Sequence, residues 1–249
     1  FVFLESIKME NKRILVIGGT GYIGKEVVSL LAKKGYSLAV LSRHNGNIEN
    51  VRYLKANVLD KPYLMQFLKE FDLIIYMAAV VRTINKSKYK QNIIGLQNTI
   101  EAMQHNGIKK MLYFSTQNIY IPKTGNYGNS KKECEKIVKE SELDYVIARP
   151  NYVYGVDKKN DFYRLYKIMK MIRLAPIIGK GRNKIQPINK KDVASMTLKI
   201  VEGWESREEV DFSGKITISL MQVADLIKRR AKIMALIIHL PLFLLKPFK

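Results

Sequence analysis

RILVIGGTGYIG, residues 13–24, is the most informative segment of this chain. An apolar run leads into a turn with glycines at Gly18, Gly21 and Gly24, and an amphipathic segment over 26–34 follows. In this strand–turn–helix order, a dinucleotide diphosphate can lie on the N-terminus of the helix. Gly18 would allow the tight turn, Gly21 would let backbone N–H groups approach phosphate, and Gly24 would let the helix pack against the strand. A plain strand–turn–helix without a ligand is the alternative, and the matching strands that follow favour the nucleotide site.

Apolar runs alternate with helical patterns along the first 150 residues. We expect strands at 13–17, 37–41, 51–55, 72–76, 111–114 and 145–148. We expect helices at 26–34, 62–70, 89–106 and 130–141. This alternation predicts an α/β fold of the Rossmann type, with a doubly wound parallel sheet and helices on both faces.

The character of the sequence changes after Pro150, where Tyr and Lys become dense. Helical stretches at 162–173, 191–202 and 220–232 alternate with short strands. We therefore expect two domains, a nucleotide-binding domain over 9–150 and a smaller C-terminal substrate lobe over 151–249. The lobe would cover the C-terminal edge of the sheet, where open α/β sheets bind ligands, and additional covering helices without a ligand role are the alternative.

Residues 233–248 form a strongly apolar segment that is interrupted by His239, Pro241 and Pro247. We expect either a closing core helix that is cut short or a segment lying in a membrane interface. No uninterrupted apolar run is long enough to span a bilayer. At the other end, Met9 resembles a natural start, with residues 1–8 as an upstream extension that makes a poor signal peptide.

The composition is that of a globular protein with a large positive charge. Hydrophobic residues make up 47% of the chain, which excludes general disorder. The 43 Lys and Arg against 22 Asp and Glu give a net charge of +21, so partners would be anionic: nucleotide phosphates, an acidic lipid surface or nucleic acid. The lysines are spread along the chain and no nucleic-acid-reading motif accompanies them, so solvated surface lysines explain the charge and nucleic acid is not expected.

Cys134 is the single cysteine, which excludes an intramolecular disulfide and a zinc quartet. It falls within a helical pattern and is expected to be a small packed residue. A reducing, cytoplasmic location follows, and we expect no metal site.

Two segments have the residue types for acid–base chemistry. Tyr127 and Lys131 stand four apart at the start of a helical pattern, so both side chains would lie on one face. A phenol has a pKa of about 10, and an ammonium nearby would lower it, so the pair could interconvert an alcohol and a ketone. Ser115 and Thr116 follow a strand directly, where a hydroxyl could donate to a substrate oxygen. A surface helix start and a simple cap are the respective alternatives.

These segments, in this order, resemble the extended short-chain dehydrogenase/reductase family, in particular its NAD(P)-dependent epimerase/dehydratase branch. The resemblance covers roughly residues 12–230. The matching segments are 18–24, 76–79, 114–120, 127–131, 149–155 and 186–194.

The resemblance implies that Tyr127 is the acid/base, that Lys131 lowers its pKa and holds the nicotinamide ribose, and that Thr116 is the catalytic hydroxyl. It implies cofactor contacts from Gly18, Thr20, Gly21, Tyr22, Ile23, Gly24, Arg43, Asn57, Val58, Ala78, Ala79, Tyr127, Lys131 and Pro150. We expect substrate contacts from Thr116 and Tyr152, and Arg82 is a candidate for contacting an anionic substrate group, with a solvated surface arginine as the alternative. Members that prefer NAD have an acidic residue at the end of the second strand, whereas this chain has Arg43, so we expect NADP to be preferred over NAD.

The resemblance implies an enzyme that epimerises, dehydrates or reduces a sugar nucleotide or a similar hydroxyl/keto compound by hydride transfer. The C-terminal lobe would then end early. The alternative is a non-catalytic nucleotide-binding assembly protein, resembling the complex I accessory-subunit branch, that contacts a membrane surface through 233–249. Homodimers are common in the family, and no residue here requires one.

Overall fold

The computed structural model describes residues 12–155 and 160–241. The chain divides into two compact units, which are described separately. The first unit comprises Phe1–Pro150 and Lys191–Phe212, and the second comprises Asn151–Lys190 and Ser213–Lys249. None of the helices in the described ranges is long and apolar enough to cross a membrane.

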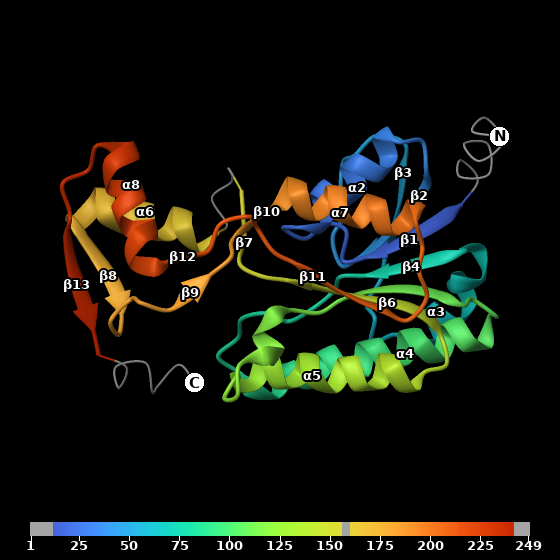
Figure 1. Ribbon diagram of the computed structural model, residues 1–249. Coiled ribbons are helices and arrows are strands. Elements are labelled where there is room, and N and C mark those ends of the chain that lie inside the picture. The colour runs from blue at the N-terminus through green and yellow to red at the C-terminus, as the bar shows by residue number, and fades with distance from the viewer. Residues whose placement is uncertain (1–11, 156–159, 242–249) are drawn as a thin grey trace. The chain divides into compact units, whose positions relative to one another are not determined.

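A seven-stranded sheet with only parallel pairs forms the centre of the first unit (Figure 1). Its strands are β1 (Arg13–Ile17), β2 (Ser37–Ser42), β3 (Val51–Lys55), β4 (Leu73–Tyr76), β5 (Lys110–Phe114), β6 (Asp144–Pro150) and β11 (Glu208–Phe212). They lie in the order β11-β6-β5-β4-β1-β2-β3. This confirms the doubly wound α/β fold, and the order reverses between β1 and β4, where such sheets bind ligands.

Helices cover both faces of this sheet. They are α2 (Gly24–Lys33), α3 (Lys61–Phe67), α4 (Lys90–His105), α5 (Gly125–Glu140) and α7 (Lys190–Glu202). Short 3₁₀ helices are η1 (Leu68–Glu70), η2 (Lys86–Tyr89) and η3 (Gln117–Tyr120). Figure 1 shows α4 and α5 on one face and α2 and α7 on the other. The helices bury their apolar residues against strands that are themselves almost fully buried, as expected for a parallel sheet covered on both faces.

Helix α5 begins at Gly125, five residues before the expected start. The sequence GNYGN over 125–129 has low helix propensity, which is why the pattern did not predict it. One local and one tertiary hydrogen bond hold this turn: Ser130 Oγ donates to the Tyr127 carbonyl within α5 (2.7 Å) and accepts from Asn92 of α4 (3.1 Å). Tyr127 therefore lies inside the helix, one turn before Lys131.

The described part of the second unit contains two helices and several short strands. Its elements are β7 (Val153–Tyr154), α6 (Asp161–Ile172), β8 (Leu174–Ile178), β9 (Lys184–Ile185), β10 (Ile188–Asn189), β12 (Ile218–Ser219), α8 (Leu220–Ala231) and β13 (Leu236–Leu240). Strands β8 and β13 pair in parallel, and a small core joins them to α6 and α8. Both helices end on a basic residue in the left-handed conformation, Arg173 (φ 58°) and Lys232 (φ 51°).

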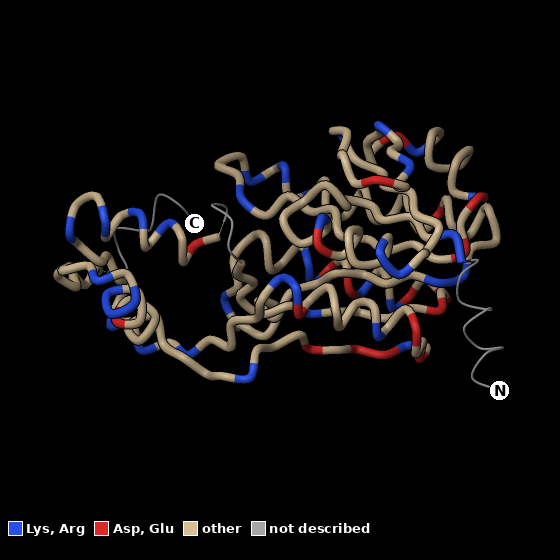
Figure 2. Tube along the Cα trace, turned by 90° about the horizontal axis from the view of Figure 1, so that it is seen from above, with Lys and Arg blue, Asp and Glu red and all other residues tan. Residues whose placement is uncertain are grey.

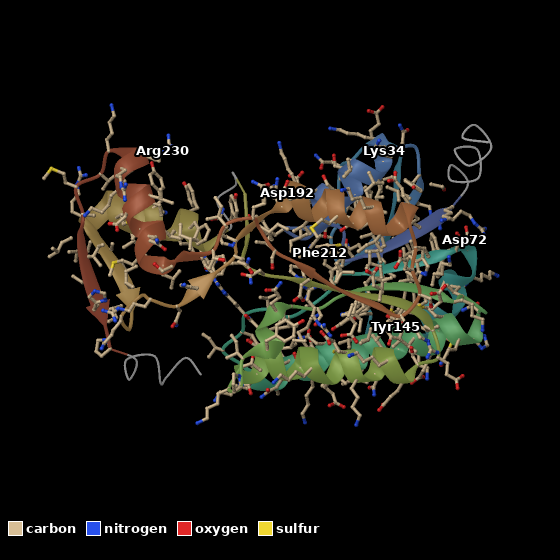
Figure 3. All side chains as sticks on the ribbon, viewed as in Figure 1. Lys34, Asp72, Tyr145, Asp192, Phe212 and Arg230 are labelled. Carbon is tan, nitrogen blue, oxygen red and sulfur yellow. The ribbon has the colours of Figure 1, made fainter. Side chains whose placement is uncertain are left out.

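The structure corrects the expected domain boundary. Residues 191–212 were expected in the C-terminal lobe, but α7 and β11 belong to the first unit. Strand β11 pairs with β6, and the Phe212 ring, labelled in Figure 3, packs edge-on against Phe114 with 6.0 Å between centroids. The added strand buries the β6 edge, which a boundary at Pro150 would expose.

The expectation of a closing helix after residue 233 was wrong for the described residues. Leu236–Leu240 is a strand, because its β-branched and apolar residues favour an extended backbone and pair in parallel with β8. The remaining residues of this segment, 242–249, lie outside the described residues, as do 1–11.

The positive charge is less even than we expected from the sequence. The second unit holds 17 of the 43 basic residues but only three of the 22 acidic ones. Figure 2 shows this excess of Lys and Arg in the part of the trace that contains α6 and α8.

Candidate functional site

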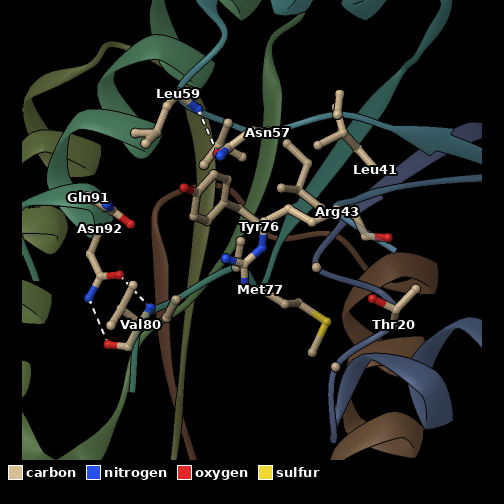
Figure 4. Close-up of a pocket in the computed structure, with 18 of the residues that line it drawn as sticks. Thr20, Leu41, Arg43, Asn57, Leu59, Tyr76, Met77, Val80, Gln91 and Asn92 are labelled. Atoms are coloured by element: carbon tan, nitrogen blue, oxygen red, sulfur yellow. Dashed lines mark hydrogen bonds between the residues drawn. The ribbon is translucent and has the colours of Figure 1, made fainter. Parts of the chain in front are cut away.

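A cavity of about 230 Å³ opens at the carboxyl ends of β1, β2 and β4. Thr20, Arg43, Asn57, Tyr76 and Gln91 surround it from different elements (Figure 4). No Asp or Glu is among its lining residues, which are Ile17, Gly18, Thr20, Gly21, Leu41, Ser42, Arg43, His44, Ala56, Asn57, Val58, Leu59, Tyr76, Met77, Ala78, Ala79, Val80, Gln91 and Asn92. Its place at the reversal of strand order and its freedom from carboxylates suit an anionic dinucleotide.

The backbone of the glycine turn lies so close to neighbouring segments that several of its glycines have no room for a side chain. Gly18 has φ +86°, and a Cβ there would lie 2.8 Å from the backbone nitrogen of Ala78. A Cβ on Gly24 would lie 2.5 Å from the Gly18 carbonyl oxygen, so Gly24 lets α2 approach the turn rather than the strand. Helix–strand contact depends instead on Gly19, which the sequence analysis did not single out: its Cβ would meet Val28 and Val40 at 2.8 and 2.9 Å. The turn therefore fits a diphosphate that must reach the backbone.

The loop after β3 forms the side wall of the cavity. Asn57 Oδ1 accepts from the Leu59 N–H (3.1 Å), and Asn98 Nδ2 donates to the Val58 carbonyl (3.1 Å). Gly95 on α4 lets this helix approach, because a side chain there would collide with Val58. Val58 is thereby fixed as an apolar wall, which suits contact with a flat heterocycle.

Asn92 is a site residue that sequence reasoning missed. It is 4% exposed, and its amide bonds both backbone groups of Val80, accepting from the N–H (2.6 Å) and donating to the carbonyl (3.2 Å). Because it also donates to Ser130 Oγ, it ties the loop after β4 to the start of α5. The available signal was a single amide on the mostly apolar buried face of α4, since buried amides are hydrogen-bonded.

Lys131 lies at the carboxyl end of β5. Its Nζ donates to the Phe114 carbonyl (2.5 Å) and lies 4.3 Å from the centroid of the Tyr113 ring. Burial lowers the pKa of Lys131 to about 8 and raises the pKa of Tyr127 to about 12. The second shift is opposite to our expectation, because burial dominates it and the neighbouring Cys134 and Tyr89 add to it. In this structure Tyr127 is therefore a protonated phenol at neutral pH.

Two hydroxyls follow β5. Thr116 Oγ1 caps η3 by accepting from the Asn118 N–H (3.3 Å), which leaves its own proton free to be donated. Ser115 Oγ is buried and has no hydrogen-bond partner among the described residues. Either hydroxyl can serve as a donor at this edge of the sheet.

A buried ion pair fixes the rear of α5. The Arg149 guanidinium of β6 donates to both carboxylate oxygens of Glu135 (2.9 and 2.6 Å), and it also contacts Glu209 of β11. The same guanidinium donates to Tyr120 Oη (3.0 Å) at the end of η3. Because Glu135 follows Lys131 by one turn, Arg149 links α5 to the segment that begins at Thr116.

The structure brings together only part of the predicted site. Gly18, Thr20, Gly21, Arg43, Asn57, Val58, Ala78 and Ala79 line the cavity. Tyr22, Ile23, Gly24, Thr116, Tyr127, Lys131 and Pro150 belong to the first unit but do not line it. Arg82 is exposed in the loop after β4. Tyr152 belongs to the second unit, where its hydroxyl donates to Asp161 Oδ2 (2.5 Å) and its ring stacks on Phe162.

Comparison with known proteins agrees with this geometry. Residues 14–211 match the model of the NAD dependent epimerase/dehydratase family. The chain is 25% identical over 194 residues to an N-acetyl-alpha-D-glucosaminyl-diphospho-ditrans,octacis-undecaprenol 4-epimerase from Escherichia coli O157:H7, covering 70% of this chain and 58% of that protein. It is 26% identical over 200 residues to a dTDP-D-glucose 4,6-dehydratase from Dictyostelium discoideum, covering 71% and 44%. The chain thus spans about half the length of the curated relatives it matches.

Solved structures share the fold. A UDP-glucuronic acid 4-epimerase from Bacillus cereus, solved with UDP-glucuronic acid and NAD, has a TM-score of 0.80 at 23% identity and covers 92% of this chain and 86% of that one. The epimerase Mth375 from Methanothermobacter thermautotrophicus has a TM-score of 0.80 at 19% identity, with 96% and 83% covered. The family model spans most of the chain, including the glycine turn and the Tyr127–Lys131 helix, so the chain belongs to the NAD dependent epimerase/dehydratase family.

Proposed function

We propose that the chain acts on a sugar nucleotide, or on a similar sugar diphosphate, as an NAD(P)-dependent epimerase or dehydratase. One observation carries the proposal: Lys131 is anchored on the Phe114 carbonyl, so the Tyr127–Lys131 turn belongs to the same carboxyl edge of the sheet as the cavity. The names of the relatives support this substrate class, since they include epimerases and dehydratases of UDP-, dTDP- and undecaprenyl-diphosphate-linked sugars.

In this proposal Tyr127 moves the hydroxyl proton of the substrate. Its raised pKa keeps the phenol protonated at neutral pH, so a proton is available for the step from ketone to alcohol. Taking up a proton requires a lower pKa, which the Lys131 ammonium would favour. Thr116 would donate to the substrate oxygen and hold it near Tyr127. When bound, NAD(P) supplies the hydride acceptor and donor and, when oxidised, a positive charge.

The test is substitution of Tyr127→Phe, with UDP-glucose, UDP-N-acetylglucosamine and dTDP-glucose as substrates. Turnover should fall about 10²- to 10⁴-fold while cofactor binding is kept, because the fold loses only one hydroxyl. Tyr63→Phe is the matched control, since Tyr63 stacks on Phe67 in α3, outside the cavity. Unchanged turnover in Tyr127→Phe would remove the assigned role.

We also propose that NADP binds more tightly than NAD. Arg43 lines the cavity at the end of β2, and the absence of carboxylates from its lining supports a site for an additional phosphate. Several structural neighbours were solved with NAD, so a preference for NADP would distinguish this chain from them. Calorimetric titration should give the lower Kd for NADP, and Arg43→Asp should weaken NADP at least about tenfold while sparing NAD. Tighter NAD binding by the unaltered chain contradicts this proposal.

The non-catalytic alternative is not favoured, because the family model and the named relatives are those of epimerases and dehydratases. Homodimerisation, membrane contact and a cytoplasmic location stay predictions.

A further inference from the structure

Four large apolar side chains are exposed together at one edge of the second unit. Met171 and Ile172 end α6 and are 69% and 57% exposed, and Met234 and Leu236 precede and begin β13 and are 86% and 68% exposed. They are neighbours because β8 and β13 pair in parallel, with Leu236 opposite Leu174. The Leu236 N–H also donates to the Arg173 carbonyl (2.9 Å). We call these four residues the apolar patch.

The patch continues onto an apolar sheet face. Ile233 and Ala235 are buried in the core with α6 and α8, whereas Met234 and Leu236 are exposed, so these two point away from that core. By strand alternation, Leu236 shares the outer face of β8 and β13 with Leu174, Pro176, Ile238 and Leu240. A sheet face in contact with water normally alternates to polar residues, and these positions contain none.

Cations surround the patch, and carboxylates are absent from it. Lys170 and Arg173 flank Met171 and Ile172 in sequence, Lys232 lies two residues before Met234, and all three cations are exposed. Arg229 and Arg230 lie in the last turn of α8, where Arg230 is labelled in Figure 3. Within the described part of the second unit, the acidic residues are Asp161 at the start of α6 and Asp225 in the middle of α8. Figure 2 shows the resulting predominance of positive charge.

From this combination we infer that the second unit binds the surface of an anionic lipid bilayer through the apolar patch. The four side chains would enter the boundary between headgroups and acyl chains, and the flanking cations would pair with lipid phosphates. A second copy of the chain is a poorer occupant, because it would bring one set of cations against another. Nucleic acid would pair its phosphates with the cations, but it would not remove the exposed methionine, isoleucine and leucine side chains from water. The inference goes beyond the proposed reaction and does not depend on it.

The experiment is co-sedimentation of the 249-residue chain with vesicles of phosphatidylcholine containing phosphatidylglycerol, and with vesicles of phosphatidylcholine alone. We expect binding to the anionic vesicles, weaker binding to the neutral ones, and a decrease as salt is raised. The double variant Met171→Glu/Met234→Glu should lower the partition coefficient at least about tenfold, because each substitution removes apolar contact and adds repulsion. Both side chains are exposed, so the thermal unfolding midpoint should stay unchanged.

Ile216→Glu is the matched control. Ile216 is 71% exposed in the same unit, but it precedes α8, whereas the patch lies beyond the C-terminal end of this helix, about 18 Å along its axis. This variant adds one carboxylate, half the charge of the double variant, and should keep at least half of the vesicle binding.

Several outcomes would overturn the inference. They are absence of binding to either vesicle, equal loss of binding in Ile216→Glu, and full binding by the double variant. Light scattering that finds a dimer abolished by Met234→Glu, without vesicle binding, would assign the patch to self-association instead. Binding of homopolymeric RNA in place of vesicles would mean that the Lys and Arg residues around the patch bind nucleic acid. None of these results would bear on turnover, so the proposed function is tested separately.

Discussion

Lys131 is a buried amine whose charge is stabilised by the Phe114 carbonyl and by the face of the Tyr113 ring. The Phe114 oxygen accepts its hydrogen bond, and desolvation lowers its pKa to about 8. In the unfolded chain the amine titrates near its ordinary value of 10.5, so the unfolded chain binds more protons between these two values. Stability contributed at this residue therefore rises with pH through that window.

Lys131→Met tests this sign. The free energy of unfolding of the original chain, relative to that of the variant, should increase from pH 8 towards pH 10.5, by at most about 1.4 kcal/mol per pH unit. Urea denaturation of both proteins without cofactor, at pH 7.5 and at pH 9.5, measures the difference. A constant difference would mean that the folded amine titrates at its ordinary pKa.

Gly18 and Gly35 offer a second comparison at the scale of a residue. Both have positive φ, +86° and +83°, but a Cβ on Gly18 would collide with Ala78, whereas a Cβ on Gly35 would meet nothing within 4 Å. Gly35→Ala should therefore cost only the left-handed backbone strain, about 1 kcal/mol, and keep cofactor affinity. Gly18→Ala should cost more and weaken cofactor binding at least about tenfold, as measured by thermal unfolding and by calorimetric titration of NADP. Equal NADP affinity in the two variants would mean that the glycine turn does not bind the cofactor.

Among the elements, helix α5 is held in position by ion pairs with strands β6 and β11. Arg149 of β6 bonds Glu135 of α5 in a fork, and Lys139 and Arg149 both bond Glu209 of β11. Burial alone would raise the pKa of Glu209, but these two cations outweigh it and lower the pKa. The helix that holds Tyr127 and Lys131 is thus fixed by charges that lie outside the cavity.

Arg149→Met should destabilise the fold by about 3–5 kcal/mol at neutral pH, because it leaves the Glu135 carboxylate buried without its partner. The contribution of Glu209 is present above its unfolded pKa and is lost as pH falls through the lowered folded pKa, so the penalty should shrink in acid. Arg164→Met is the control, since its pair with Asp161 is exposed and should contribute less than about 1 kcal/mol. Urea denaturation at neutral and at acidic pH distinguishes the two, and a pH-independent penalty would contradict the account.

The order of strands and helices was predictable because each buried strand is a continuous apolar run between turn residues. The start of α5 was not, because Gly125 and Gly128 disfavour a helix and only contacts with α4 make one there. The glycine turn and Arg43 were predictable from local spacing. Asn92 and the raised pKa of Tyr127 were not, because both depend on burial by segments distant in sequence.

For the whole molecule, the return of the chain from the second unit to the first is the main feature that local patterns did not predict. Residues 191–212 complete the sheet and cover it with α7, whose Val193, Ala194 and Leu198 are buried. The helix at 191–202 was predicted from its sequence pattern. The apolar face of a helix does not, however, indicate which of the two units it packs against.

A protein fragment over 12–150 should therefore aggregate, because β6 becomes an edge strand and the α7 contact face becomes exposed. Residues 12–212 with 151–190 replaced by a flexible Gly/Ser linker should remain soluble and unfold in one cooperative transition. Circular dichroism and sedimentation of both proteins provide the comparison. A stable, monomeric 12–150 fragment would show that β11 and α7 are dispensable.

The two residues in the left-handed conformation at the helix ends, Arg173 and Lys232, suggest a compromise between thermal stability and binding to lipid. A glycine would adopt the conformations of Arg173 and Lys232 without strain, so exchanging either for glycine should make the cofactor-free protein more resistant to heat. If the two cations serve attachment to lipid, the same exchanges should loosen the protein from anionic vesicles. Greater heat resistance and weaker adhesion would then arise together from one substitution.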